Sequence, residues 1–248
     1  MKVMMSCDNN PLYYQFWNEV SYVWNNIFGI EPVLIYIDDE DNETLNEDNG
    51  KIVRINREKD IPVYLQGQLA RVYYTSLFQD EVCILSDIDI IPLSKDFFDK
   101  KKIENNVEED SFYHLSPVKR EFGQLPMCYY AGHGKTFNNL FPNFTWREFL
   151  ENVISYDFNV NKLGYILPKH LHGNNLWFSD ELFLFTKIRE KNSKIRLNNT
   201  YIRESQRISR EQIMTVKHDS ISNYIDCHMP RPYDIYQKQI NYIIWNME

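Results

Sequence analysis

Residues 82–93 read Val-Cys-Ile-Leu-Ser-Asp-Ile-Asp-Ile-Ile-Pro-Leu, an apolar run that contains two carboxylates at positions two residues apart. The four apolar residues at the start of this run are typical of a strand that is buried on both faces. Asp87 and Asp89 follow directly, and carboxylates among isoleucines are costly to bury unless a positive group pairs with them. The stretch therefore predicts a buried strand that ends at a charged site.

The first ninety residues alternate between strand-like and helix-like segments. Apolar runs at 2–6, 32–37 and 52–55 predict three further strands, while apolar residues at helical spacing predict helices over 12–27 and 66–78. This alternation predicts an α/β fold with a mostly parallel, Rossmann-like sheet that is flanked by helices on both faces. Ligands bind such sheets at the carboxyl ends of the strands.

The second half of the chain is less regular, and its topology does not follow from the pattern. We expect short strands at 112–115 and 125–131 and helices at 146–154 and 232–245. The stretch 100–110 is rich in charged and amide residues, so we expect an exposed connection there. The length of 248 residues and the hydrophobic content of 43% suit one large core, which favours a single domain.

Composition excludes several classes of partner and location. The formal net charge of −8 argues against nucleic acid and anionic membranes, because their phosphates are neutralised by basic side chains. We expect no signal peptide and no membrane segment, since charged residues come early and no apolar run reaches transmembrane length. The cysteines, which show no Cys-x-x-Cys spacing, are expected to be reduced. A cytoplasmic protein follows as the expectation.

A divalent cation is the natural partner for Asp87 and Asp89. Hard oxygen ligands suit Mg²⁺ or Mn²⁺, and these ions retain water and bind substrate phosphates as well as protein side chains. The alternative is that the two aspartates only cap a turn before Pro92. A single aspartate would be enough for a cap, so the pair favours a metal site.

The run at 84–93 resembles the Asp-x-Asp segment of glycosyltransferases of the GT-A fold. The pair Ala70-Arg71 precedes it by one short helix, as in many GT-A enzymes, whose arginine contacts the first aspartate or the donor. Residues 177–181, Trp-Phe-Ser-Asp-Glu, resemble the Trp-x-x-Asp-Glu element that in several GT-A families lies against the sugar and the acceptor. The resemblance covers most of the chain and includes small enzymes encoded by large DNA viruses, for which the location would be the host cytoplasm.

The resemblance implies a metal-dependent glycosyltransferase that moves a sugar from a nucleotide-sugar donor to a hydroxyl acceptor, expected to be a glycan or a glycoprotein. It implies Mn²⁺ or Mg²⁺ as the cofactor and a UDP-sugar as the favoured donor, with a GDP-sugar as the alternative. The expected architecture is a single GT-A-like domain over 1–248. Within it, 1–95 would form the nucleotide-binding half and 96–248 the acceptor-side half.

The resemblance also implies roles for individual residues. Asp180 and Glu181 are the expected catalytic carboxylates, one of them acting as a base or facing the anomeric carbon, although both could instead cap the helix that begins there. Inverting and retaining reactions both stay open. The expected metal ligands are Asp87, Asp89 and His228, with His218 as the rival third ligand. The expected donor-binding residues are Cys7, Asp8, Arg71, Asp87 and Arg231.

Two other functions compete with this interpretation. A haloacid-dehalogenase-like phosphatase also uses an Asp-x-Asp motif, but that fold places the motif on its first strand. A non-catalytic sugar-binding module could use aromatic side chains such as Tyr73 and Tyr74, which are more often part of a core. Such a module needs no divalent cation, so Asp89→Ala would leave its affinity intact.

Overall fold

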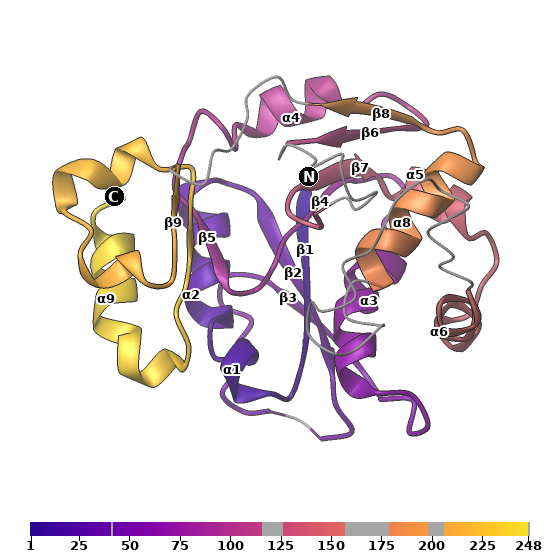
Figure 1. Cartoon of the computed structure of the whole chain (residues 1–248), viewed down its shortest axis with the longest axis horizontal. Helices are drawn as coiled ribbons and strands as arrows, with labels where there is room; N and C mark the ends of the chain where they lie inside the picture. The colour runs from indigo at the N-terminus through magenta and orange to yellow at the C-terminus, as the bar shows by residue number, and fades with distance from the viewer. Residues whose placement is uncertain (41, 116–125, 157–178, 198–205, 248) are drawn as a thin grey trace.

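The computed structural model describes residues 1–40, 42–115, 126–156, 179–197 and 206–247. Within them, a seven-stranded sheet in the order β3-β2-β1-β4-β7-β6-β8 is covered by helices on both faces (Figure 1). Four of the six neighbouring pairs are parallel, and β7 runs antiparallel to both of its neighbours. The predicted α/β fold with a mostly parallel sheet is confirmed. The strands are β1 (Lys2–Asp8), β2 (Glu31–Ile37), β3 (Lys51–Ile55), β4 (Val82–Leu85), β6 (Ser111–His114), β7 (Tyr130–His133) and β8 (Lys194–Leu197).

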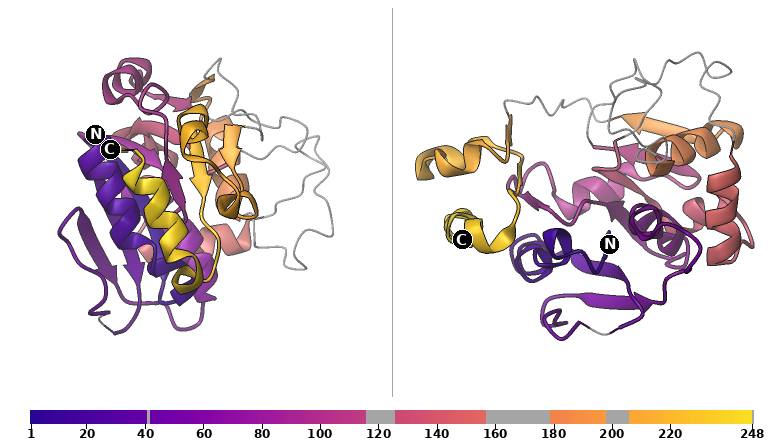
Figure 2. Two further views of the ribbon diagram at one scale, coloured as in Figure 1. Left: turned by 90° about the vertical axis from the view of Figure 1, so that its left-hand side faces the viewer. Right: turned by 60° about the horizontal axis from the view of Figure 1, so that its bottom comes forward.

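The strands of the first half are apolar throughout because their side chains alternate between two cores. Met5 and Leu34 enter one core, whereas Met4 and Val33 enter the other. The first core packs against α1 (Pro11–Tyr14), α2 (Trp17–Tyr22), the π-helical turn η1 (Val23–Ile27) and α9 (Tyr233–Trp245). The second packs against α3 (Val63–Thr75), α5 (Gly134–Leu140), α6 (Trp146–Ser155) and α8 (Ser179–Glu190). Figure 2 shows α9 alongside the N-terminal helices, where Tyr233 bonds to Glu19 of α2.

Local signals set several helix boundaries. Asn10 Oδ1 accepts a hydrogen bond from the Leu12 N–H at 3.0 Å, which caps α1 just before its first residue, a proline. Thr145 and Glu148 form a capping box at the start of α6. Gly29 follows η1 with a φ of 64°, a conformation that glycine adopts without strain.

A separate three-stranded sheet, β5-β10-β9, ties the C-terminal part of the chain to the residues that follow β4. Its strands are β5 (Ile90–Pro92), β9 (Arg207–Ile208) and β10 (Asp226–His228), and β5 runs antiparallel to β10. Asp226 is fully buried, accepts two hydrogen bonds of 2.6 Å from Arg207 and a third of 2.8 Å from the Tyr129 hydroxyl. This sheet brings His228 beside Asp89, although 139 residues separate them in sequence.

Two expectations for the second half are wrong in part, since 100–110 is mostly exposed as expected but is not a plain connection, and the strand expected at 125–131 has other bounds. The stretch 100–110 contains a helix, α4 (Lys100–Asn106), because Asp99 caps it through the Lys102 N–H at 2.7 Å and Ile103 is buried. The strand expected at 125–131 is β7, which begins only at Tyr130; residue 125 lies outside the described residues. The turns η4 (Gln212–Met214) and η5 (His218–Asn223) complete the C-terminal part. None of the helices in the described ranges has the length and apolar character that crossing a membrane requires.

Candidate functional site

The carboxyl ends of β1 and β4 meet where the strand order reverses, since β2 and β3 lie beyond β1 and the remaining strands lie beyond β4. Ligands of open α/β sheets bind at such a point. A pocket of about 480 Å³ opens there, within the size range of small-molecule sites. Its walls come from the end of β1, from α3, from the Asp-x-Asp segment, from the start of α8 and from the C-terminal part of the chain.

The structure brings all the predicted site residues to this one pocket. They come from segments that are far apart in sequence, and they are Cys7, Asp8, Arg71, Asp87, Asp89, Asp180, Glu181, His228 and Arg231. The side chain of His218, the rival third ligand, lies outside what the structure describes, as does Trp177 of the Trp-x-x-Asp-Glu element.

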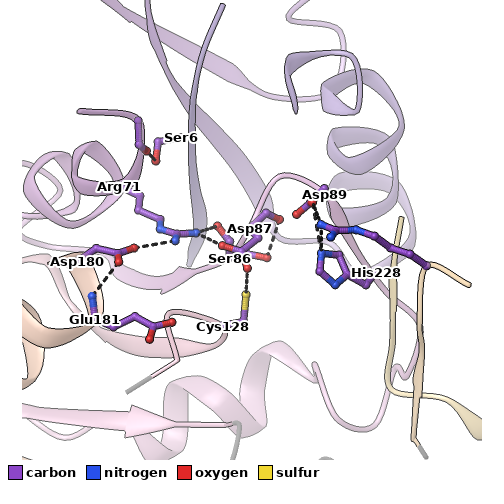
Figure 3. Close-up of polar contacts among 11 residues, drawn as sticks. Ser6, Arg71, Ser86, Asp87, Asp89, Cys128, Asp180, Glu181 and His228 are labelled. Carbon is purple, nitrogen blue, oxygen red and sulfur yellow. Dashed lines mark hydrogen bonds and ion pairs between the residues drawn. The ribbon is translucent and has the colours of Figure 1, made fainter. Parts of the chain in front are cut away.

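Arg71 is the centre of one charge cluster (Figure 3). Its Nη1 donates to the Ser86 carbonyl at 2.9 Å and pairs with Asp87, while its Nη2 donates to Asp180 Oδ2 at 3.0 Å. Burial alone would lower the pKa of Arg71, but the charges of Asp87 and Asp180 outweigh burial and raise it. Arg71 therefore stays a cation, and the contact with the first aspartate that the resemblance implies is present.

Both oxygens of Asp87 are engaged by protein groups. Oδ1 pairs with Arg71, and Oδ2 accepts a hydrogen bond from Cys128 Sγ at 2.9 Å. Burial acts to raise the pKa of Asp87, but the Arg71 charge and the Cys128 hydrogen bond together lower it to about 2. Asp87 is therefore ionised at neutral pH and fixed in orientation, with 37% of its side chain exposed at the pocket.

Asp89 belongs to a second charge cluster. It is only 4% exposed, and its Oδ2 lies 2.6 Å from Arg210 Nη2, 3.3 Å from His228 Nε2 and 3.9 Å from Arg231 Nε. Burial would raise the pKa of Asp89, but the hydrogen bond and charge of His228 and the charge of Arg210 lower it. Asp89 is thus a buried carboxylate whose partners are positive or can become so.

Asp89 and His228 suit a divalent cation as part of its ligand set. Carboxylate oxygen and imidazole nitrogen are both ligands that Mn²⁺ accepts. Among the residues that the structure describes, no three His, Cys, Asp or Glu side chains together form a complete site. Asp87, the other aspartate expected to bind the cation, also bonds to Arg71 and Cys128, and each of its oxygens keeps a lone pair for a further partner. Water or substrate oxygens would therefore have to supply the other ligands.

Helix α8 presents two carboxylates at its first turn. Asp180 Oδ1 accepts a hydrogen bond from the Glu181 N–H at 2.9 Å, while Asp180 Oδ2 pairs with Arg71. Burial raises the pKa of Asp180 despite Arg71. Burial, followed by the charges of Asp180 and Asp87, raises the pKa of Glu181 to about 8. A carboxyl group that titrates near neutral pH is suited to general acid–base chemistry.

The end of β1 forms another part of the pocket wall. Asp8 Oδ1 accepts a hydrogen bond from the Asn10 N–H at 3.2 Å, and burial raises the pKa of Asp8. Cys7 is 5% exposed, and burial raises the pKa of its thiol well above the ordinary value. Cys7 is therefore a neutral thiol, which suits contact with an uncharged part of a ligand.

Two contacts in the site have no signal in the sequence. Cys128 bonds to Asp87 across 41 residues, and Arg210 pairs with Asp89 across 121 residues. Neither residue belongs to a spacing pattern that predicts a ligand or a catalytic group. Each meets its partner only because strands that are distant in sequence pair with each other. The pairing of β7 with β4 brings Cys128 to Asp87, and the pairing of β10 with β5 and β9 brings Arg210 to Asp89.

A second hollow, of about 600 Å³, lies over α6 and the residues that precede it. Two of the carboxylates that line it already have partners at that helix. Glu148 accepts hydrogen bonds from Thr145, and Glu151 accepts one from Arg147. Carboxyl groups whose pKa values are raised by burial line the first pocket together with three guanidinium groups, so the first pocket is the better candidate site.

No protein-family model matches this chain, and no curated protein shows significant similarity to it. What the pocket does therefore has to be inferred from its own residues.

Proposed function

We propose that this chain is a metal-dependent glycosyltransferase, which moves a sugar from a nucleoside-diphosphate donor to a hydroxyl group of a glycan. The observation that carries this proposal is the division of one pocket into two kinds of chemistry. One side holds Asp89, His228 and Arg231, which suit a cation and a diphosphate. The other side holds Asp180 and Glu181, of which Glu181 titrates near neutral pH.

The diphosphate side accounts for binding and for the departure of the leaving group. A cation held by Asp89 and His228 would offset the negative charge that develops on the diphosphate. Arg231 adds a guanidinium, which matches phosphate geometry, and its side chain is placed over the Tyr13 ring at 4.7 Å. The end of β1, with Cys7 and Asp8, is left for the nucleoside. UDP is our favoured nucleotide and GDP the alternative.

The acceptor side accounts for proton transfer. The acceptor oxygen bonds to the anomeric carbon of the sugar, the bond from that carbon to the diphosphate oxygen breaks, and the acceptor proton passes to Glu181. Asp180 has both oxygens engaged, by Arg71 and by the Glu181 N–H, so it positions Glu181 rather than taking the proton itself. Arg71 fixes Asp87 and Asp180 relative to each other.

The placement of the Asp-x-Asp segment argues against the phosphatase alternative. The haloacid-dehalogenase fold carries this motif after its first strand, whereas Asp87 and Asp89 follow β4. The strand β1 ends instead at Cys7 and Asp8, which offer one carboxylate and a neutral thiol.

Binding linkage gives a direct test of the proposal. We expect UDP with Mn²⁺, at a concentration 100 times the dissociation constant, to raise the melting temperature by about 5 to 10 °C, because such saturation adds about 2.7 kcal/mol to a chain of this size. The measurement is a thermal-shift panel of UDP, GDP and CDP, each with Mn²⁺ and with EDTA. Asp89→Asn, which keeps the side-chain shape, should abolish the joint effect.

Two outcomes would contradict the proposal. A panel in which no nucleotide shifts the melting temperature, with or without the cation, would remove its basis. If sugars are added to the panel, a sugar that stabilises wild type and Asp89→Asn equally in EDTA would favour the binding module, which needs no cation.

A further inference from the structure

Arg210 lies between the two side chains that suit a cation. Its Nη2 is 2.6 Å from Asp89 Oδ2 and 2.5 Å from His228 Nε2, and its Nε donates to the Met229 carbonyl at 3.2 Å. The side chain lines the pocket and is 31% exposed, on the turn between β9 and η4. A guanidinium group thus contacts the same two atoms that a cation would bind.

Arg210 in this position and a cation on the same atoms exclude each other. An imidazole nitrogen that accepts a hydrogen bond has one lone pair, so His228 Nε2 can direct it to the Arg210 N–H or to a metal, but not to both. If Nε2 carries the proton instead, it has no lone pair for a metal at all. A guanidinium and a divalent cation at these distances also repel each other. Binding of a cation therefore requires Arg210 to leave Asp89.

We propose that Arg210 is a displaceable counter-ion, which neutralises Asp89 when the pocket is empty and moves to the donor diphosphate when the cation and the donor bind. This inference rests on the proposed function, because it takes the cation and the diphosphate as ligands of the pocket. Arginine suits this exchange, since its planar fork pairs equally well with a carboxylate and with phosphate oxygens. Its position on a turn at the pocket wall lets it change partner without a rearrangement of the sheet.

The exchange predicts that the cation and the donor help each other to bind. A cation that binds without the donor must replace Arg210 at the buried Asp89 carboxylate, and Arg210 then has no new partner. A diphosphate in the pocket gives Arg210 that partner, so the cation binds more tightly in its presence. Linkage then requires the cation to tighten donor binding by the same factor.

The test is Mn²⁺ binding, measured from the electron paramagnetic resonance signal of free Mn²⁺, with and without UDP. For the wild type we expect UDP to raise the Mn²⁺ affinity by roughly tenfold, within the usual span of coupling factors. For Arg210→Ala we expect roughly tenfold tighter Mn²⁺ binding without UDP, little further gain with UDP, and weaker UDP binding at saturating Mn²⁺. The matched control is Arg196→Ala on β8, whose exposed side chain is 3.7 Å from Glu108; it should behave as wild type.

A second variant keeps the test valid if Arg210→Ala does not fold. Arg210→Lys retains the charge beside Asp89 but loses the fork. We expect it to leave Mn²⁺ binding near the wild-type value and to weaken UDP binding. An Arg210→Lys protein with wild-type affinity for UDP would contradict the predicted contact with the diphosphate.

Failure of this inference can be told apart from failure of the proposed function. If wild type and Arg210→Ala bind Mn²⁺ equally without UDP, while both bind it with UDP, Arg210 does not compete with the cation and the glycosyltransferase proposal stands. If neither protein binds Mn²⁺ under either condition, both proposals are wrong.

Discussion

Replacement of Arg71 by methionine is expected to lower the free energy of unfolding by about 3 kcal/mol near pH 7 in the absence of metal. Methionine fills much of the volume of the buried stem but leaves Asp180 and Asp87 without their shared cation. A buried carboxylate that loses its partner typically costs about 3 to 5 kcal/mol. We take the lower value because Asp87 is 37% exposed and is partly solvated.

The pH dependence identifies charge as the cause of this loss. In the wild type the pKa of Asp87 is lowered to about 2, so its contribution to stability is present above its ordinary pKa and is lost as the pH falls through about 2. Without Arg71, burial raises the pKa values of Asp87 and Asp180 in the folded state. The contribution of these two carboxyl groups to the variant's stability is then greatest at acid pH and is lost as the pH rises through those raised values. The difference between the two proteins should therefore grow from about pH 4 to pH 7.

Urea unfolding of both proteins at these two pH values, in EDTA, measures the difference. Arg196→Met is the control, because the Arg196 side chain is 53% exposed and its change should stay within about 0.5 kcal/mol. An Arg71→Met protein that loses the same stability at both pH values would show that the packing of the stem matters rather than the charge.

The sequence predicts the first half of the fold because its strands are buried on both faces. Runs at 2–6, 32–37, 52–55 and 82–85 correspond closely to β1, β2, β3 and β4. Parallel strands between two helical layers must be apolar on both sides, and such runs are visible without any knowledge of tertiary contacts. The helix expected at 66–78 is α3, which begins three residues earlier, at Val63.

The second half could not be derived in the same way, because its elements are shaped by contacts that are distant in sequence. Helix α4 buries only Ile103 among its own residues, so its composition resembles that of an exposed connection. Strand β7 pairs with β4 in the opposite direction, and nothing local in residues 125–131 fixes that register. The small sheet of β5, β10 and β9 joins segments that lie more than 100 residues apart.

The candidate site shows the same division. Asp87 and Asp89 are adjacent to a strand that the pattern predicts, so their place in the pocket follows from the fold. Their partners do not follow from it. Whether Asp87 faces a cation or faces Arg71 and Cys128 depends on side-chain packing, and Arg210 reaches Asp89 only through the register of the small sheet.

Replacement of Glu181 by glutamine is expected to lower kcat by about 10²- to 10⁴-fold, the range for loss of a general base. The wild-type rate should rise with pH, since Glu181 accepts a proton only when it is ionised. Its pKa of about 8 in the metal-free protein sets the upper limit for this rise, because a bound cation favours the ionised form. The measurement is kcat against pH for both proteins with the donor that the thermal-shift panel identifies.

The stability of the metal-free protein gives a readout that does not depend on turnover. The pKa of Glu181 is raised from 4.5 to about 8 in the folded state, so its contribution to stability is fully present below about 4.5 and is lost as the pH rises through about 8. Glutamine has no proton to lose. We therefore expect Glu181→Gln to be more stable than the wild type above pH 8, by as much as about 5 kcal/mol, and similar to it below pH 4.5.

The matched variant is Asp180→Asn, which changes the neighbouring carboxylate on the same helix. Because the charge of Asp180 raises the pKa of Glu181, its replacement should lower that pKa and shift the pH dependence of kcat to lower pH, whereas Glu181→Gln should remove this dependence. If Glu181→Gln gains stability at high pH but keeps full turnover, burial makes the charged form of Glu181 unfavourable, but Glu181 is not the base. If Asp180→Asn then removes turnover, Asp180 takes the proton and Glu181 only raises its pKa. Turnover and its pH dependence in the two variants therefore show which of the two carboxylates takes the proton.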